Sequence, residues 1–294
     1  MKGEEYMKTI GFIGVGIMGK SMVRNLMKAG YELHIYARTK AKVEDVIAEG
    51  AVFHDSIGAC VADRDAVITI VGYPADVEEV YFEPGNIFDS AKKGAYLIDM
   101  TTSSPSLAER IYEEGTQRGF RVMDAPVTGG DIGAKNGTLS ILVGGQKEDF
   151  DACMPIFKGM GTNINYQGAA GCGQHAKMAN QIIIAGTISG VCEALAYAKE
   201  KGLDLQVLFD SVSTGAAGGS QLTNQGSKII KGNYDPGFFI KHFIKDMKLA
   251  KEEAEAADLS LEVLNQALAN YQELEDAGFG ELGTQALIKH YEKN

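Results

Sequence analysis

The sequence predicts an α/β first half, with a doubly wound and mostly parallel sheet, followed by an all-α second half. Short apolar runs alternate with helical periodicity from Thr9 to about Asn165. The strand signals then stop, and one long apolar helix pattern follows at 171–202. A chain of 294 residues is also longer than one hydrophobic core usually serves. We therefore expect two domains, residues 1–168 and 169–294, joined through the long helix.

Apolar runs in the first half have the length and composition of buried strands. They are TIGFIG at 9–14, LHIYA at 33–37, AVITIV at 66–71, AYLIDM at 95–100, FRVMDA at 120–125 and LSILVG at 139–144. Amphipathic stretches at 21–30 and 106–119 lie between runs and end in glycines of the kind that terminate helices. We expect these stretches to be the crossover helices of the sheet.

The second half is predicted to be helical throughout. Its long helix at 171–202 opens with a glycine loop and is too apolar to be solvated on all sides, so we expect it to lie between the domains. No repeat or low-complexity linker separates the halves, which predicts a junction of packed elements near 166–172. Further helices are expected at 205–213, 241–257, 261–277 and 283–292.

Composition and charge exclude several classes of protein. A net charge of −11 repels nucleic acid and acidic membrane surfaces, so we expect neither as a partner. The N-terminal MKGEEYMKTIGFIG has no basic segment followed by a long apolar run, which predicts a cytoplasmic location. Residues 1–6 precede the segment that Met7 opens and carry no functional pattern. The four cysteines have no metal-binding spacing, so we expect reduced core thiols and no metal site.

A glycine motif, GVGIMG, stands between the first strand and the first helix, the context of a dinucleotide-binding Rossmann domain. Gly14 permits the tight turn, Gly16 lets the backbone approach a pyrophosphate, and Gly19 allows close helix packing. The NH groups at the helix start, where Ile17 and Met18 lie, would hold the anion. A glycine-rich turn without a cofactor is the alternative.

The end of the second strand bears on the choice between NAD and NADP. An acid usually follows that strand and binds the ribose hydroxyls. Here the sequence is YARTK at 36–40, with no carboxylate. The guanidinium of Arg38 and the hydroxyl of Thr39 suit a 2′-phosphate, which favours NADP(H) over NAD(H). A solvated basic loop is the alternative.

Two further segments carry candidate reaction chemistry. In DAPVTGG at 124–130, Thr128, Gly129 and Gly130 follow a predicted strand and form a candidate anion cradle, although a plain turn would look similar.

In the long helix, Lys177, Asn180 and Gln181 share one face. These groups are costly to bury unless a polar ligand pairs with them, although solvation at the helix end is the alternative. A lysine there can act as general acid and base.

His175 is not expected to join that face, because residues two apart point about 200° from one another on a regular helix.

The motifs together resemble the β-hydroxyacid dehydrogenase family, which includes 3-hydroxyisobutyrate dehydrogenase, tartronate semialdehyde reductase, and the glyoxylate and succinic semialdehyde reductases. FIGVGIMGKSMVRNL at 12–26 is similar to the family's N-terminal signature, DAPVTGG to its substrate-binding motif, and GCGQHAKMANQ at 171–181 to its catalytic motif. The resemblance covers nearly the whole chain. It implies a catalytic role for Lys177, with Asn180 and Gln181 orienting the substrate.

The resemblance also implies that Thr128, Gly129 and Gly130 bind the substrate carboxylate. It places Thr102 near both nicotinamide and substrate. The segment FFIKHFIKDM at 238–247 resembles the family segment that closes the active site from the α domain. This implies that Phe238 and Asp246 contact the substrate and that Lys245 approaches the cofactor; on sequence alone, Lys245 and Asp246 read as a surface charge pair.

The chain departs from the family pattern at two positions, since Thr128 stands where many relatives have Ser and Gln181 replaces a common Asn. Both changes alter the shape of a pocket without removing its chemistry. YARTK resembles the NADPH-using reductase branch. We therefore expect hydride transfer between the cofactor and a small β-hydroxy acid or its semialdehyde, a small-molecule carboxylate, with Lys177 as acid and base.

Other functions remain open on the sequence. One is an NAD-dependent 3-hydroxyisobutyrate dehydrogenase, and another is imine reduction, against which Lys177 argues. A catalytically silent NADP-binding or scaffolding protein belongs to a different class. The apolar long helix and the long α domain predict a homodimer or homotetramer.

Overall fold

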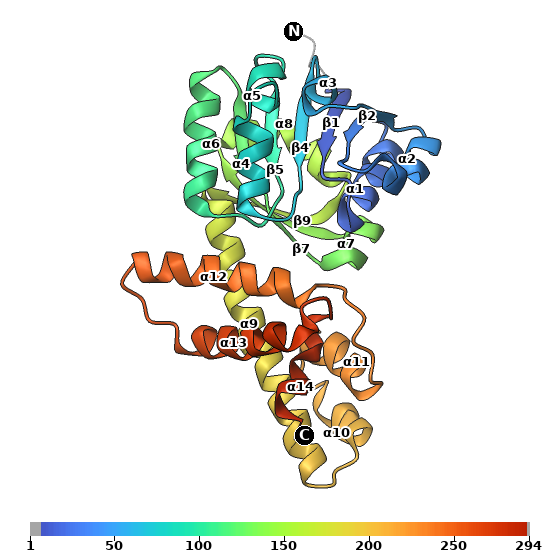
Figure 1. Ribbon diagram of the computed structural model, residues 1–294, viewed down its shortest axis with the longest axis vertical. Coiled ribbons are helices and arrows are strands. Elements are labelled where there is room, and N and C mark those ends of the chain that lie inside the picture. The colour runs from blue at the N-terminus through green and yellow to red at the C-terminus, as the bar shows by residue number, and fades with distance from the viewer. Residues whose placement is uncertain (1–6, 293–294) are drawn as a thin grey trace. The chain divides into compact units, whose positions relative to one another are not determined.

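The computed structural model describes residues 7–292, which form two compact units that divide between Lys177 and Met178. Residues 1–6, in which the sequence shows no functional pattern, lie outside the described part. The N-terminal unit is α/β and the C-terminal unit is helical (Figure 1), so the predicted fold class is confirmed. The division falls inside the long helix α9 (Cys172–Glu200), beyond the expected domain boundary at residue 168.

The N-terminal unit is built on a nine-stranded sheet in the order β3-β2-β1-β4-β5-β6-β8-β7, with β9 paired to β8. The pairs from β3 to β6 are all parallel, whereas β8 runs antiparallel to β6 and β7 and parallel to β9. The strand order reverses between β1 and β4, which is where doubly wound sheets bind ligands. The strands are β1 (Thr9–Ile13), β2 (Glu32–Tyr36), β3 (Val52–Phe53), β4 (Ala66–Thr69), β5 (Tyr96–Asp99), β6 (Arg121–Asp124), β7 (Val127–Thr128), β8 (Leu139–Gly145) and β9 (Gly161–Gly168).

The six strands expected from apolar runs are all present, and three others are not visible in the sequence. β3 and β7 have two residues each, too few for a periodic pattern. β9 has the sequence GTNINYQG, in which most residues are exposed and polar. Among the described strands it pairs with β8 alone, so it forms an edge of the sheet. An edge strand with a solvated face lacks the continuous apolar run that marks a central parallel strand.

Helices cover both faces of the sheet and bury a separate apolar core on each. Neighbouring residues Val67 and Ile68 of β4 are both fully buried and belong to opposite cores, as expected of a strand covered on both faces. One face carries α3 (Ile57–Val61), α4 (Pro74–Phe82), α5 (Ile87–Ser90) and α6 (Pro105–Gln117), of which the last three stand together in Figure 1. The other carries α1 (Ile17–Lys28), the 3₁₀ turn η1 (Lys40–Val43), α2 (Glu44–Ala48), α7 (Gly130–Asn136) and α8 (Lys147–Lys158).

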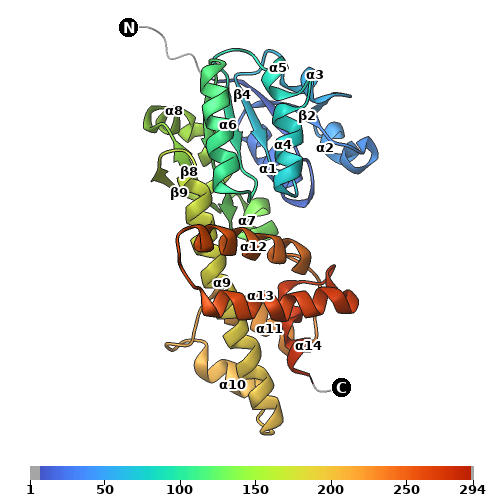
Figure 2. The same cartoon turned by 60° about the vertical axis from the view of Figure 1, so that its left-hand side comes forward.

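The C-terminal unit packs its helices around a third core to which α9 contributes Ile188, Cys192 and Leu195. α12 and α13 lie side by side in it (Figure 2). Its elements are the C-terminal part of α9, then α10 (Leu205–Val212), the π-helical η2 (Gln221–Gly226), α11 (Ser227–Ile230), α12 (Ile240–Ala256), α13 (Glu262–Leu274), the π-helical η3 (Glu275–Phe279), the 3₁₀ turn η4 (Thr284–Leu287) and α14 (Ile288–Tyr291).

Two of the expected helices differ in the structure. The helix expected at 261–277 ends at Leu274 and continues as η3, because Gly278 has a φ of 88° that an α-helix cannot contain. The helix expected at 283–292 is divided between η4 and α14. α9 is long and apolar enough to cross a membrane by length and composition alone, a property that core helices of globular proteins share.

Candidate active site

The glycine loop between β1 and α1 combines two crowded positions with one open position. A Cβ at Gly14 would lie 2.0 Å from the carbonyl oxygen of Ile70, and one at Gly19 would lie 2.1 Å from the carbonyl oxygen of Gly14. A Cβ at Gly16 would meet nothing within 4 Å. Gly14 therefore lets the loop approach the residue that follows β4, and Gly19 lets α1 pack against the loop. The backbone at Gly16 faces open space.

The start of α1 has the properties of an anion site. Gly16 is its N-cap and has no side chain that could accept from the first-turn NH groups, which include those of Ile17 and Met18. The first turn contains no acidic residue that would oppose an anion. Open backbone and a positive helix end are what a pyrophosphate requires, so these residues fit a dinucleotide.

Arg38 and Thr39 follow β2 on the surface of the same unit. The side chain of Arg38 is 77% exposed, and its Nη1 lies 3.5 Å from Oδ1 of Asp76. Asp76 also accepts from the backbone NH of Tyr73 at the start of α4, so its carboxylate is held in place. An exposed ion pair of this length contributes little free energy, which leaves the guanidinium able to turn toward a phosphate. Thr39 begins η1 without a side-chain capping bond.

A buried carboxyl group organises the loop after β5, where Thr102 lies. Oδ1 of Asp99 accepts from the hydroxyl of Thr69 at 2.7 Å and from the backbone NH of Thr101 at 3.1 Å. The hydroxyl of Thr101 accepts in turn from the NH of Val71 at 3.0 Å. Burial raises the pKa of Asp99 to about 6. The carboxyl ends of β4 and β5 are thus tied together beside half-buried Thr102.

Thr128, Gly129 and Gly130 form the connection from β7 to α7. Gly129 has a φ of 127° and Gly130 a φ of 64°, conformations that glycine adopts much more readily than other residues. A Cβ at Gly130 would meet nothing within 4 Å, so space lies beside this backbone. The first turn of α7 also contains Asp131, whose carboxylate would oppose a bound anion.

The first turn of α9 is bound to the sheet by Asp124, the last residue of β6. Its Oδ1 accepts from the NH of Gly171 and its Oδ2 from the NH of Gln174, both at 2.8 Å. Burial raises the pKa of Asp124, and the hydrogen bonds from these backbone NH groups act in the opposite direction and lower it. Lys177 lies one turn farther along α9 and is 6% exposed, whereas His175 is exposed. The different exposure of these two side chains fits their predicted separation on the helix.

The remaining predicted residues belong to the C-terminal unit. Hydrogen bonds and an ion pair connect four of them through the buried side chains of Gln181 and Asp246. Asn180 donates to Oε1 of Gln181, and Nε2 of Gln181 donates to Oδ2 of Asp246, each at 2.6 Å. Nζ of Lys245 lies 2.9 Å from Oδ1 of Asp246, which is 2% exposed. These residues are therefore no surface charge pair. Phe238 is half-buried and packs on Phe243 with ring centroids 5.6 Å apart.

Several predicted residues of the N-terminal unit follow the carboxyl ends of strands: those of the glycine loop, Thr102, and the turn at Thr128. Lys177 lies on α9, which Asp124 anchors to the carboxyl end of β6. Arg38 and Thr39 stand beyond the end of β2. Sequence reasoning missed the polar residues that support this edge: Asp99, Thr101, Asp124 and Gln174. A signal was present in the sequence, since Asp99 and Asp124 are each the next-to-last residue of an otherwise mostly apolar run. The structure pairs these two residues in the sheet.

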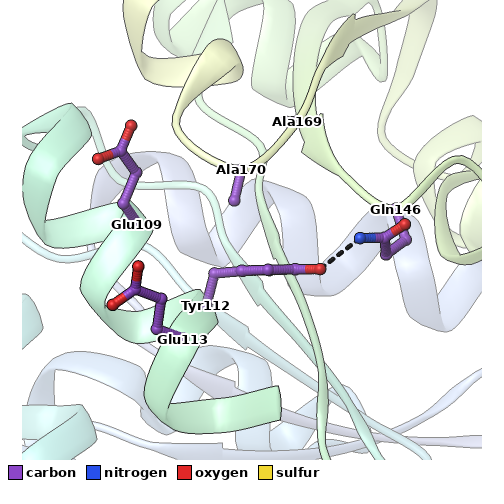
Figure 3. Close-up of a pocket in the computed structure, with 6 residues that line it drawn as sticks. All are labelled: Glu109, Tyr112, Glu113, Gln146, Ala169 and Ala170. Carbon is purple, nitrogen blue, oxygen red and sulfur yellow. Dashed lines mark hydrogen bonds between the residues drawn. The ribbon is translucent and has the colours of Figure 1, made fainter.

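A pocket of about 280 Å³ lies elsewhere on the same unit (Figure 3). It is lined by Glu109, Tyr112 and Glu113 of α6 and by Gln146, Ala169 and Ala170, with Gln146 donating to the hydroxyl of Tyr112. None of its lining residues is one that the sequence predicts for the active site. Its two carboxylates would repel a carboxylate substrate, so this pocket does not suit the expected chemistry.

Among residues 7–292 no group of three His, Cys, Asp or Glu side chains could hold a metal ion, and the four cysteines are free.

Comparison with known proteins shows likeness over nearly the whole chain. It is 51% identical over 286 residues to an uncharacterized oxidoreductase of Bacillus subtilis, which covers 97% of this chain and 99% of that protein. It is 37% identical over 252 residues to 2-hydroxy-3-oxopropionate reductase of Escherichia coli, covering 86% of each. The solved structure of Mycobacterium tuberculosis 3-hydroxyisobutyrate dehydrogenase with L-serine is 27% identical, covers 98% of this chain and 100% of its own, and has a TM-score of 0.89.

Family models account for both halves. The NAD-binding domain of 6-phosphogluconate dehydrogenase matches residues 9–168, and the NAD-binding domain of NADP-dependent 3-hydroxyisobutyrate dehydrogenase matches residues 171–291. The fold and the glycine loop thus define a dehydrogenase that uses a nicotinamide dinucleotide and acts on CH–OH groups. The chain belongs to the β-hydroxyacid dehydrogenase family.

Proposed function

We propose that this protein is an NADPH-dependent reductase that converts a short semialdehyde acid into the corresponding β-hydroxy acid. The observation that carries the proposal is the position of Lys177, a buried lysine one turn beyond the helix start that Asp124 holds at the carboxyl edge of the sheet. The dinucleotide loop opens at that same edge of the same unit. A cation there can protonate an oxygen on which negative charge develops.

In this proposal Lys177 donates the proton that completes the product hydroxyl group, and accepts it in the reverse direction. The bound nicotinamide supplies or accepts the hydride. Thr128, Gly129 and Gly130 bind the substrate carboxylate, and Thr102 lies beside the reacting carbon. Asn180, Gln181, Phe238 and Asp246 would orient the substrate, and Lys245 would bind the cofactor.

Preference for NADP(H) is supported by Arg38, because its exposed guanidinium and the hydroxyl of Thr39 stand where an acid would bind the ribose of NAD(H). Reduction of a semialdehyde is supported by the likeness to the E. coli reductase. The second candidate is an NAD-dependent 3-hydroxyisobutyrate dehydrogenase. The likeness to the M. tuberculosis 3-hydroxyisobutyrate dehydrogenase supports its substrate, but not its cofactor. A catalytically silent dinucleotide-binding protein would have no need of a buried lysine at this edge.

A panel of short semialdehydes and β-hydroxy acids, each assayed with NADPH, NADH and their oxidised forms, tests the proposal. We expect reduction with NADPH, and a loss of about 10²- to 10⁴-fold in kcat on Lys177→Met with dinucleotide binding retained. His175→Gln is the matched control, because that exposed side chain lies two residues away on another side of α9. Tight NADPH binding without turnover of any panel member would instead indicate the silent class.

We also propose that the protein acts in the cytoplasm as a homodimer or homotetramer. The exposed apolar side chains of the C-terminal unit, which include Ile183, Tyr197 and Val263, support self-association. Sedimentation at two protein concentrations measures the assembly directly.

A further inference from the structure

The side chain of Gln174 pairs with both ends of a tripeptide whose middle residue is Thr102. Its Nε2 donates to the carbonyl oxygen of Thr101 at 2.7 Å, and its Oε1 accepts from the NH of Ser103 at 3.0 Å. The Gln174 side chain is fully buried, so water cannot replace either bond. One amide thus uses a donor and an acceptor to hold the segment that the proposed function assigns to the nicotinamide and the substrate.

The backbone of Gln174 is held as firmly as its side chain. Asp124 accepts from the NH groups of Gly171 and Gln174, and two glycines allow this close approach. A Cβ at Gly144 would lie 2.5 Å from Oδ1 of Asp124, and one at Gly173 would lie 2.7 Å from Oδ2. The first turn of α9 is therefore fixed to β6 through Asp124 and to the loop after β5 through Gln174.

Lys177 follows Gln174 by three residues and so shares its face of α9. Helical side chains lean toward the N-terminus of their helix, which directs the Lys177 stem over the turn that Gln174 occupies. We infer that Gln174 and Asp124 are positioning residues. They form a clasp, defined by Asp124, Gln174 and the backbone of Thr101 and Ser103, that sets Lys177 relative to Thr102. This inference rests on the proposed role of Lys177 as the proton donor.

Gln174→Met removes both side-chain bonds while keeping nearly the same volume. We expect kcat to fall about 10- to 100-fold, because small displacements of a catalytic group carry costs of this order. The KM for NADPH should change less than kcat, since the glycine loop that would bind the pyrophosphate lies outside the clasp. Asn270→Leu is the matched control: Asn270 is another buried amide that accepts one bond, from Gln266, and donates one, to Tyr291, but it lies on α13. It should lose stability and keep its kcat.

Gln174→Glu provides a pH signature that a purely structural role would lack. Ionised Glu can accept from Ser103 but cannot donate to Thr101, whereas protonated Glu can do both. The kcat of this variant, as a ratio to wild type at each pH, should therefore rise as the pH falls from 8 toward 5. The same ratio for Gln174→Met should stay flat. Asp124→Asn replaces one of the two acceptor oxygens by an NH2 group that faces a backbone NH, so we expect this variant also to lose kcat.

A second measurement does not depend on turnover. Lys177 is 6% exposed, so we expect a water-soluble succinimidyl ester to acylate it slowly while the clasp is intact. The rate of this modification, followed by peptide mass spectrometry, reports on the clasp. We expect at least a fivefold faster rate in Gln174→Met and an unchanged rate in Asn270→Leu. If the wild-type protein turns over no substrate of the panel, the proposed function is wrong. The labelling rates of Lys177 in the wild type and in Gln174→Met still test the clasp in that case. A folded Gln174→Met variant with wild-type labelling and wild-type kcat would overturn the inference.

Discussion

Arg38 is the residue on which the cofactor preference depends. Charge-assisted bonds to a phosphate contribute about 1.5–3 kcal/mol, so Arg38→Ala should raise the KM for NADPH by about 10- to 100-fold. The KM for NADH should change little, because NADH carries no 2′-phosphate. Steady-state kinetics with both cofactors measure this, with Lys42→Ala, on the exposed turn η1, as a control for general loss of positive charge. Equal effects of Arg38→Ala on the two cofactors would contradict the assignment.

Asp99 makes the stability of the N-terminal unit depend on pH. Its pKa is raised to about 6 by burial, whereas an unfolded Asp titrates near 4. The unfolded chain therefore loses its proton first, so the free energy of unfolding falls as the pH rises from about 4 through about 6 and is then level. A shift of this size amounts to at most about 3 kcal/mol.

Asp99→Asn keeps the oxygen that accepts from Thr69 and Thr101 and removes the charge. We expect it to be about 1–3 kcal/mol more stable than wild type above pH 7 and to lose that advantage near pH 4. Urea unfolding across this range gives the comparison. Asp151→Asn, at an exposed carboxylate on α8, is the control for removal of one negative charge elsewhere on the unit. A constant offset for Asp99→Asn would show that the raised pKa is not its cause.

At the scale of residues, the sequence predicts those that belong to local motifs and misses those that act through distant partners. The glycine motif and the spacing of Lys177, Asn180 and Gln181 are readable within a few residues. Asp124 and Gln174 meet across 50 positions of sequence, and Gln174 reaches Thr101 across 73. Nothing local to either residue specifies such pairings, because they exist only after β5, β6 and α9 have come together.

Close packing of α9 against the sheet depends on glycine at its start. A Cβ at Gly173 would lie 2.5 Å from the carbonyl oxygen of Leu142, so Gly173→Ala must displace backbone. We expect a loss of about 1–3 kcal/mol in the free energy of unfolding. Gly190→Ala, in the same helix, would meet nothing within 4 Å and should instead gain about 0.5–1 kcal/mol from helix propensity. Chemical denaturation of both variants tests the contrast; a Gly173→Ala variant as stable as wild type would contradict it.

At the scale of elements, strands and helices were predictable where one periodic pattern dominates. The central strands are buried on both faces and so appear as apolar runs. The short helices α2, α3 and α5 have five residues or fewer, too few to establish a 3.6-residue period. The irregular turns η2 and η3 were missed because π-helical geometry has no simple sequence signature. Tertiary packing decides such segments.

For the whole molecule, the separate cores of the two units predict a local response to ligand. NADPH at about 100 times its Kd stabilises the part that it binds by about 2.7 kcal/mol. Amides of β1, β4 and β5 that exchange only when the N-terminal unit unfolds should then exchange about 100-fold more slowly. Amides of α13 should be nearly unaffected, since α13 packs in a different core. Equal slowing in both sets would show that the units unfold together.

The fold class was accessible from the sequence because the two halves differ in periodicity along their whole length. Right-handed parallel crossovers then fix the face of the sheet on which each connecting helix lies. The antiparallel turn through β7 and β8 and the added strand β9 were not accessible, since two of these three strands carry no continuous apolar signal.

The polar composition of β9 has a consequence for the behaviour of the protein at high concentration. An open sheet edge can template the addition of strands from other molecules, and that risk is greatest where the edge is long, flat and apolar. β9 is eight residues long, but Asn163 and Asn165 are exposed and bond to neighbouring side chains. We expect apolar replacements at these two positions to make strand addition at this edge more favourable. The asparagines of β9 therefore make the edge a poor template for a second molecule.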